Sequence, residues 1–351
     1  MSFELPEDKS DLSDADYARL REALKAAFAQ TGDADTAPDA EAPPIVVYGY
    51  SSERFAKEMA DSIDATLARV SHRQHPDDEI EPELLSNIQG RNVIFVASGS
   101  GDPSKQMFEA QTMLSLINSG GPKSLTGVFP YMWYNAGDDK RGQRKAQTAV
   151  IAIENVRTHL DHAIVIRPHN NSITNATFED ALNLKRCIMP HMAYALGVQL
   201  ADLCEKGTLD PDDIVFVNAD AGAGKRNGPE VKEALYRGMG EYAPSGADPE
   251  KDLWPTPDKL RGRDSGETQS AMKGDGFDVE GKVVVTLEDM IRSAGTLTKE
   301  FAPGLKQAGA KSIIAYAPHG LFPYDEKKGQ EPTAAIDRIN NSDLDLVIIG
   351  N

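Results

Sequence analysis

The sequence predicts an α/β fold, in which mostly parallel sheets are flanked by helices. Short, continuously apolar runs rich in β-branched residues recur from Ile45 onward, a pattern typical of strands buried on both faces. The spacers between them are long enough for crossover helices, and the 351 residues indicate two domains. The eight predicted strands are 45–49, 92–98, 125–131, 162–167, 213–219, 282–287, 311–317 and 344–350.

An acidic N-terminal extension, residues 1–44, precedes the first predicted strand. It holds eleven Asp and Glu against four Lys and Arg. Tyr17, Leu20, Leu24 and Phe28 share one helical face, and a linker rich in Pro, Ala and acidic residues follows at 31–44. This pattern predicts a short docking helix on a tether, and a mostly disordered solubilising tail is the alternative.

Two spacers are informative. Residues 52–69 have helical periodicity and begin with a Ser that can cap a helix. The stretch 238–280 is polar, rich in Gly and Pro, and too long for an ordinary connection. It is therefore predicted to be either a disordered insert or a mobile functional loop.

Composition excludes several classes of protein. The 37 Lys and Arg against 55 Asp and Glu give a formal net charge of −18, which disfavours nucleic-acid polymers as partners. No apolar stretch approaches the roughly 18 residues that span a bilayer, and the N-terminus is acidic, so we expect a cytoplasmic protein without a membrane partner. Cys187 and Cys204 lie in no CxxC pair, which argues against a disulfide framework or a cysteine metal site.

The strongest chemical signal follows the strand predicted at 282–287. Glu288 and Asp289 end the apolar run, and the small residues Ser293 to Thr296 then lead into a helical pattern. Small residues allow backbone N–H groups to approach a phosphate at a helix N-terminus, while the two acids can accept hydrogen bonds from sugar hydroxyls. The segment predicts a pocket for a pentose 5-phosphate. An acidic N-cap with a small-residue turn is the alternative.

This segment, LEDMIRSAGT, resembles the phosphoribosyl-binding loop of type I phosphoribosyltransferases and ribose-phosphate pyrophosphokinases (PRPP synthetases), which reads Asp-Asp-x-x-Asp-Thr-x-Gly-Thr in the synthetases. Residues 304–322 and 335–350 resemble the synthetases in particular, and the similarity covers most of 45–351 in the same order. It implies two phosphoribosyltransferase-like domains, 45–195 and 205–351, with a catalytic loop or insert at 238–280. The implied ribose 5-phosphate site comprises Asp220, Glu288, Asp289, Ser293, Ala294, Gly295 and Thr296.

Two strand ends fit the resemblance. VNADAGAGKR (217–226) is similar to the family's Pro-Asp-x-Gly-Gly-x-Lys-Arg segment, which implies that Asp220 lies at the metal and ribose site and that Gly222 and Gly224 form close-approach turns. VIRPHNNSI (165–173) corresponds to the family's Asp-Leu-His segment, which implies that His169 ligates or orients Mg²⁺ at the ATP phosphates. Taken alone, the first pattern is also that of a plain turn, and a lone His after a strand is usually a polar cap.

Two loops supply the remaining implied residues. HPDDE (75–79) is similar to the family's Phe-x-Asp-Gly-Glu loop, in which Asp77 and Glu79 would receive the adenine of ATP across a subunit boundary, with His75 in place of Phe. An acidic solvated turn is the alternative. DKLRGR (258–263) is similar to the family's Lys-Arg-Arg catalytic loop, which implies that Lys259 and Arg261 reach the triphosphate.

The chain departs from the family pattern at several positions. PYMWYNAGDDKR (130–141) lacks the Arg-Gln pair with which the synthetases contact ATP, so Lys140 and Arg141 are the expected substitutes. Arg292 replaces the third acid of the sugar-phosphate loop. The segment 238–257 lengthens the region of the catalytic loop.

The resemblance implies a ribose-phosphate diphosphokinase that uses Mg²⁺, ATP and ribose 5-phosphate. An adenine site shared between chains implies a homo-oligomer, either a dimer or a hexamer. Two alternatives are a non-catalytic homologue that binds and regulates synthetase partners, and a phosphoribosyltransferase that consumes PRPP with a base.

Overall fold

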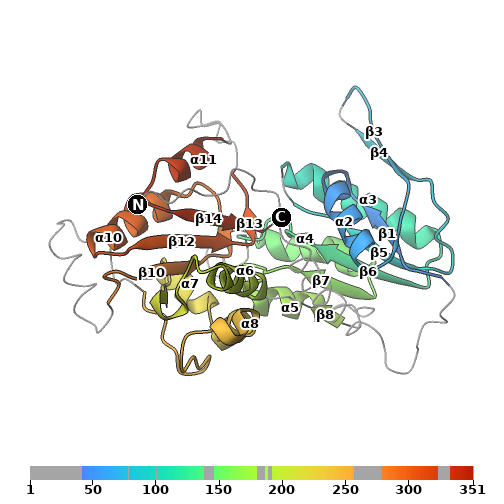
Figure 1. The fold of residues 1–351 in the computed structure, drawn as a ribbon. Helices are drawn as coiled ribbons and strands as arrows, with labels where there is room; N and C mark the ends of the chain where they lie inside the picture. The colour runs from blue at the N-terminus through green and yellow to red at the C-terminus, as the bar shows by residue number, and fades with distance from the viewer. Residues whose placement is uncertain are drawn as a thin grey trace.

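The computed structural model describes residues 42–77, 79–99, 101–137, 146–179, 186–188, 192–256, 278–322 and 333–350. Two parallel sheets lie in the two halves of the chain, side by side in Figure 1. All eight predicted strands are present in these sheets, so the α/β prediction is confirmed.

The first half is built on a six-stranded parallel sheet in the order β2-β1-β5-β6-β7-β8. One face packs on helices α3, α4 and α5, and the other face packs on α2, so the central strands are apolar on both sides. The strands are Thr66–Leu67 (β2), Ile45–Tyr48 (β1), Asn92–Val96 (β5), Ser124–Phe129 (β6), His162–Val165 (β7) and Arg186–Ile188 (β8); the helices are Glu53–Ser62 (α2), Pro103–Ser119 (α3), Thr148–Arg157 (α4) and Asn171–Glu179 (α5).

The second half has a four-stranded parallel sheet in the order β14-β12-β10-β9. Alternate residues of β10 face opposite cores: Val283 and Val285 pack toward α6 and α8, whereas Val284 packs toward η4 and α10. The elements are Ile214–Phe216 (β9), Val283–Leu287 (β10), Ser312–Ala317 (β12), Leu346–Ile349 (β14), Ala193–Glu205 (α6), Ala221–Arg226 (α7), Pro229–Met239 (α8), the π-helix Leu297–Phe301 (η4), Ala302–Gln307 (α10) and Thr333–Asn340 (α11).

Helices α6 and α8 approach each other closely through two glycines. A Cβ on Gly197 would overlap the carbonyl oxygen of Leu235, and one on Gly238 would overlap that of Tyr194. Side-chain atoms at either position would therefore force the helix backbones apart. Because α6 contributes from Ala193 onward to the second core, this core begins close to the predicted junction of 45–195 and 205–351, and the domain ranges stay a prediction.

The helix predicted at 52–69 is too long. Helix α2 ends at Ser62, Asp64 adopts a left-handed φ of 56°, and Thr66–Leu67 then pairs with Ile45 and Val46 as strand β2. The Ser52 side chain makes no capping hydrogen bond. Parallel pairing of β2 with β1 overrides the local helical periodicity, because it adds a strand to the edge of the sheet.

An antiparallel hairpin that the sequence did not predict follows β2. Strands Val70–Gln74 (β3) and Ile80–Leu84 (β4) pair with each other and project away from the rest of the first half (Figure 1). The turn of this hairpin carries His75 and Asp77. Its exposure explains why alternating, weakly apolar residues were not recognised as strands.

The described part of the stretch 238–280 is packed rather than disordered. After the 3₁₀ turn Gly240–Tyr242 (η3), Trp254 is buried and stacks on Phe216 at a centroid distance of 5.0 Å. Its indole N–H donates to the Tyr236 hydroxyl (3.1 Å), which in turn donates to Asp252 (2.7 Å). Residues 257–277 lie outside the described chain, so both alternatives stay predictions for them.

Candidate functional site

Three strand ends that carry sequence-predicted residues meet where the two halves of the chain face each other. His169 follows β7, Asp220 follows β9, and the Glu288-Asp289 pair follows β10. In parallel sheets, the carboxyl ends of neighbouring strands form one edge, where ligands commonly bind. The structure therefore brings together residues that lie up to 120 positions apart.

His169 and Asp289 make a direct contact between the halves. The imidazole Nδ1 donates to Asp289 Oδ2 at 2.6 Å, and the Asp289 carboxylate is only 3% exposed. The backbone N–H of His169 donates to the Asn135 side chain at 2.9 Å, which fixes the loop after β7. The ring is thus oriented from both its backbone and its side chain.

Arg226 joins the two acids from helix α7. Its Nη2 lies 3.3 Å from Glu288 Oε2 and 3.2 Å from Asp289 Oδ1. Asp220 caps the same helix by accepting the backbone N–H of Ala223 at 2.7 Å. Helix α7 therefore presents a cation and a carboxylate to the same cluster.

The pKa values of the two adjacent acids, Glu288 and Asp289, shift in opposite directions. Burial raises the pKa of Glu288 to about 7, and the nearby Asp220 and Asp289 charges add to the rise against the opposing Arg226 charge. For Asp289, burial also favours the neutral form, but the His169 hydrogen bond and the Arg226 charge outweigh it and lower the pKa. Near neutral pH, Asp289 is thus a fixed anion and Glu288 is poised between two protonation states.

Arg167 lies beside this cluster in an unusual conformation. Its backbone φ is 43°, in the left-handed region that is costly for a residue with a Cβ, and its side chain is 7% exposed. Burial lowers the pKa of its guanidinium. The Nη2 atom donates to Asn227 Oδ1 at 2.9 Å. His319 also holds this backbone segment, since its Nε2 donates to the carbonyl oxygens of Ile166 (3.0 Å) and Arg167 (3.2 Å).

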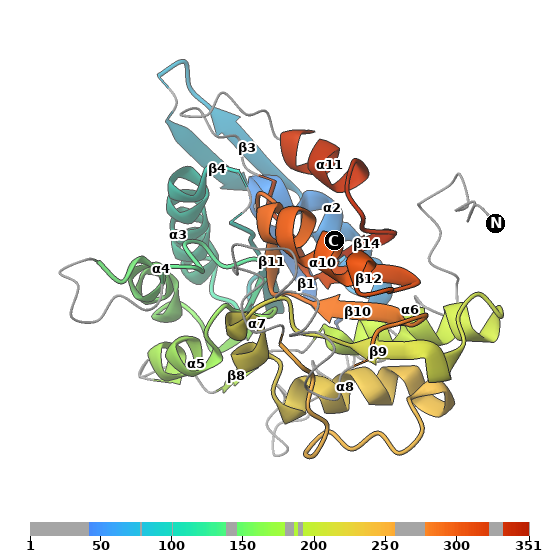
Figure 2. The ribbon, with the colours of Figure 1, turned by 90° about the vertical axis from the view of Figure 1, so that its left-hand side faces the viewer.

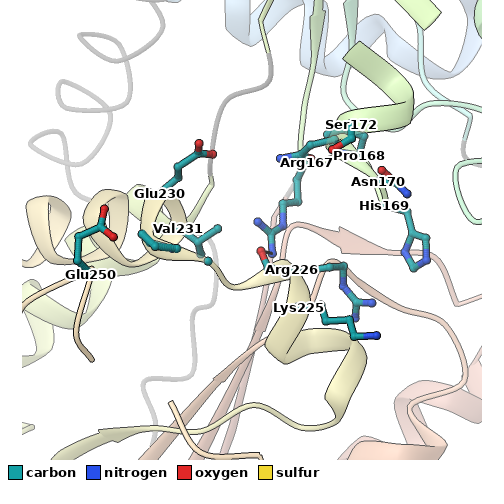
Figure 3. Close-up of a pocket in the computed structure, with 13 residues that line it drawn as sticks. Arg167, Pro168, His169, Asn170, Ser172, Lys225, Arg226, Glu230, Val231 and Glu250 are labelled. Atoms are coloured by element: carbon teal, nitrogen blue, oxygen red, sulfur yellow. Dashed lines mark hydrogen bonds between the residues drawn. The ribbon is translucent and has the colours of Figure 1, made fainter. Parts of the chain in front are cut away.

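A cleft of about 500 Å³ opens between the loop after β7 and helices α7 and α8. Figure 3 shows Arg167 and His169 descending from the loop on one side, with Lys225 and Arg226 below them on α7. Glu230 and Glu250 lie at the other end. The cationic end suits a phosphate group, because fixed positive charges in a partly enclosed cleft attract anions strongly.

The predicted phosphate loop, Ser293 to Thr296, begins after a short strand, Met290–Ile291 (β11), which pairs with His319–Gly320 (β13). Ala294 takes a left-handed φ of 57°, and its carbonyl oxygen accepts the N–H of Thr298 at 3.0 Å as the helix begins. The Ser293 carbonyl accepts Arg338 Nε of α11 at 2.9 Å. A Cβ built on Gly295 would touch only Ser293 Oγ, at 3.6 Å, so this residue leaves room for a ligand.

Other predicted residues lie away from this cluster. His75, Asp77 and Glu79 occupy the turn of the β3–β4 hairpin, which stands apart from α7 in both Figure 1 and Figure 2. There His75 pairs with Glu81 at 3.1 Å. Lys140, Arg141, Lys259 and Arg261 lie outside the described residues.

Sequence reasoning assigned no role to Arg226, Arg167 or Asn227. Arg226 is the last residue of the segment 217–226, which is similar to a family segment that also ends in Lys-Arg, so the resemblance could have identified it. Gly222 and Gly224 were predicted to form turns, which is wrong, because both lie in helix α7. The close approach is nonetheless real: a Cβ on Gly222 would lie 3.0 Å from Asp220 Oδ1, and one on Gly224 would lie 3.1 Å from Thr256 Oγ1.

The described residues contain no group of three or more His, Cys, Asp and Glu side chains arranged to hold a metal ion. Asp220 is an oxygen donor of the kind that Mg²⁺ prefers, and this ion commonly uses one or two carboxylates together with substrate phosphates. The donor set therefore fits a metal that arrives with a phosphorylated substrate. No helix in the described ranges has the length and apolar character to cross a bilayer.

Comparison with known proteins agrees with the sequence resemblance. Residues 45–159 match the model of the N-terminal domain of ribose phosphate pyrophosphokinase. The chain is 26% identical over 307 residues to a ribose-phosphate pyrophosphokinase of Chromobacterium violaceum (87% of this chain, 81% of the relative) and 25% identical over 307 residues to that of Aquifex aeolicus (87% and 86%). A crystal structure of phosphoribosylpyrophosphate synthetase from Mycobacterium smegmatis has a similar fold, with a TM-score of 0.67 at 18% identity, over 88% of each chain. The predicted resemblance is thereby confirmed.

Proposed function

We propose that this chain, which resembles the ribose-phosphate pyrophosphokinases over most of its length, is a ribose-phosphate diphosphokinase that converts MgATP and ribose 5-phosphate to PRPP and AMP. The observation that carries the proposal is the contact between His169 and Asp289 across the two halves. The resemblance assigns His169 to the nucleotide and Asp289 to the sugar phosphate, so their contact supports a transfer between two substrates bound side by side.

Ribose 5-phosphate would bind in the second half. Its phosphate would lie on Ser293 to Thr296, where Gly295 leaves space and the start of a helix favours an anion. The 2- and 3-hydroxyls would donate to Glu288 and Asp289. Arg226 and His169 already hold these carboxylates in fixed positions, so little ordering is needed when the sugar binds.

The ATP phosphates would lie in the cleft beside Arg167, Lys225 and Arg226. Ribose O1 would then attack the β-phosphorus, forming the O1–P bond while the bond from that phosphorus to the oxygen of AMP breaks. Transfer of this kind depends mainly on positioning and on fixed positive charge. Lys259 and Arg261, with Lys140 or Arg141, are proposed to complete the cationic surround.

Asp220 and His169 would hold or orient Mg²⁺ together with the substrate phosphates. When bound, the ion would neutralise phosphate charge. The adenine is proposed to lie against His75, Asp77 and Glu79 of a second copy, since this hairpin stands apart from the cluster of its own chain. The protein would then act as a homo-oligomer, at least a dimer and, by the family resemblance, up to a hexamer.

The test is direct: purified protein is incubated with MgATP and ribose 5-phosphate, and AMP and PRPP are followed together. Equal amounts of both products are expected. Binding of ribose 5-phosphate without any product would refute the catalytic proposal and favour the non-catalytic homologue. Consumption of PRPP with a purine or pyrimidine base, in place of its formation, would indicate a phosphoribosyltransferase.

A further inference from the structure

Asn227 lies at the centre of a buried hydrogen-bond network that connects the strand ends of the site. It is the residue after helix α7 and is only 3% exposed. Its Oδ1 accepts Arg167 Nη2 at 2.9 Å, and its Nδ2 donates both to Asn218 Oδ1 and to the Leu287 carbonyl oxygen, each at 3.0 Å. Because arginine can only donate and a carbonyl can only accept, these partners fix the orientation of the amide.

Each partner of Asn227 stands just ahead of a residue in the candidate site. Arg167 precedes His169 by two positions, Asn218 precedes Asp220 by two positions, and Leu287 is followed at once by Glu288 and Asp289. One side chain thus bonds to all three segments that converge on the cluster.

Asn218 extends the network to a fourth segment. Its Nδ2 donates to the Trp254 carbonyl at 2.7 Å, and its backbone N–H donates to the Pro255 carbonyl at 2.9 Å. Both Asn218 and Asn227 are buried, so loss of either side chain would leave a buried polar group of the other without a hydrogen bond and would destabilise the fold. The network also crosses between the halves, because Arg167 belongs to the first and Asn227 to the second.

We infer that Asn227 is a positioning residue for the diphosphoryl transfer, acting through Arg167 and Leu287 on the contact between His169 and Asp289. Its amide sets the distance between a loop of one half and a strand of the other. Phosphate binding does not depend on it directly, because Ser293 to Thr296 are held by Arg338 and by the β11–β13 pair. The kinetic part of this inference rests on the proposed function.

The variants Asn227→Ala and Asn227→Asp test the inference. The second keeps the volume and the acceptor for Arg167 but loses both donated hydrogen bonds. The matched control is Thr286→Val, since Thr286 is fully buried in β10 and its hydroxyl has no hydrogen-bond partner among the described residues. The readouts are kcat, the KM for ribose 5-phosphate, and the ring-nitrogen NMR signals of His169, identified by their loss in His169→Gln.

Both Asn227 variants should lower kcat by roughly 10- to 100-fold, the effect expected of a displacement of about 1 Å, with KM changed much less. Their His169 signals should shift, and Thr286→Val should change neither readout. A kcat within about twofold of the parent, or unmoved His169 signals, would overturn the inference. If Asn227→Ala does not fold, Asn227→Asp decides by the same criteria. If the parent protein forms no PRPP, the proposed function fails separately, and the His169 signals alone decide this inference.

Discussion

His169 and Asp289, 120 residues apart in the chain, meet through a hydrogen bond of 2.6 Å between imidazole Nδ1 and carboxylate Oδ2. The contact joins the loop after β7 to the end of β10 and is reinforced by Arg226 on the other carboxylate oxygen, at 3.2 Å. A displacement of the loop after β7 is therefore expected to move the end of β10, and the reverse, through this contact.

The first prediction concerns the strength of this contact. In a double-mutant cycle of His169→Ala and Asp289→Asn, we expect a coupling of about 1–3 kcal/mol in the free energy of unfolding, because the carboxylate is buried and charged. Urea denaturation provides the measurement. The exposed pair His75 and Glu81, at 3.1 Å, is the control, for which a coupling below about 0.5 kcal/mol is expected.

The pH dependence of the same cycle has a defined sign. The pKa of Asp289 is lowered, so its contribution is complete above the ordinary aspartate pKa of about 3.9 and is lost as the pH falls through its lower value in the folded protein. Additive effects of the two substitutions at pH 7 would show that the contact does not stabilise the fold.

The second prediction is a pH-dependent affinity for ribose 5-phosphate. Burial raises the pKa of Glu288 to about 7, so the stability that its protonated form contributes is present below pH 4.5 and lost as the pH rises through 7. The ionised form accepts sugar hydroxyls better, so affinity should rise roughly fivefold from pH 6 to pH 8. Calorimetric titration of Glu288→Gln should leave only the change due to the ligand's own phosphate. An equally steep profile in that variant would exclude Glu288 as the titrating group.

The third prediction places the phosphate. Gly295→Ala should weaken ribose 5-phosphate binding roughly tenfold, about the value of one hydrogen bond to a charged group, because the new methyl group, which would contact only Ser293 Oγ at 3.6 Å, points to where the phosphate would lie. The melting temperature should not change, since the Cβ has room in the free protein. Unchanged affinity would place the phosphate elsewhere.

The fourth prediction concerns the α6–α8 contact. Gly197→Ala should lower the free energy of unfolding by about 1–3 kcal/mol, because its Cβ overlaps backbone atoms of α8 that cannot move singly. The higher helix propensity of alanine offsets part of this loss. Chemical denaturation measures the change, with Gly295→Ala as the control that should not alter stability. A stabilised Gly197→Ala protein would contradict the close packing.

The fifth prediction addresses the proposed catalytic loop. Lys259→Ala should lower kcat by roughly 100-fold or more while the dissociation constant for ribose 5-phosphate stays nearly constant, because its charge is needed for the transferred group and not for the sugar phosphate. Lys251, an exposed residue paired with Asp248, is the matched control, and its replacement by alanine should preserve kcat. Equal rates for both variants would show that the loop is assigned wrongly.

The sequence by itself determined the α/β class, the eight strands and the positions of the acid pair and the small-residue loop. These features depend on local periodicity and on residues adjacent in the chain. Local patterns failed where a tertiary contact competed with them. The predicted helix 52–69 ends early, and strand β2 begins at Thr66 because it pairs with β1. The β3–β4 hairpin is too exposed to show the apolar pattern of a buried strand.

Only the tertiary structure decided how the site is assembled. Nothing in the sequence near Arg167 or Asn227 indicates that these two residues bond across 60 positions, or that His169 reaches Asp289 across 120. Such contacts depend on how two sheets face each other, and their buried polar atoms are satisfied only in that arrangement. Sequence periodicity thus specified the strands, whereas the packing of the two halves selected which strand ends act together.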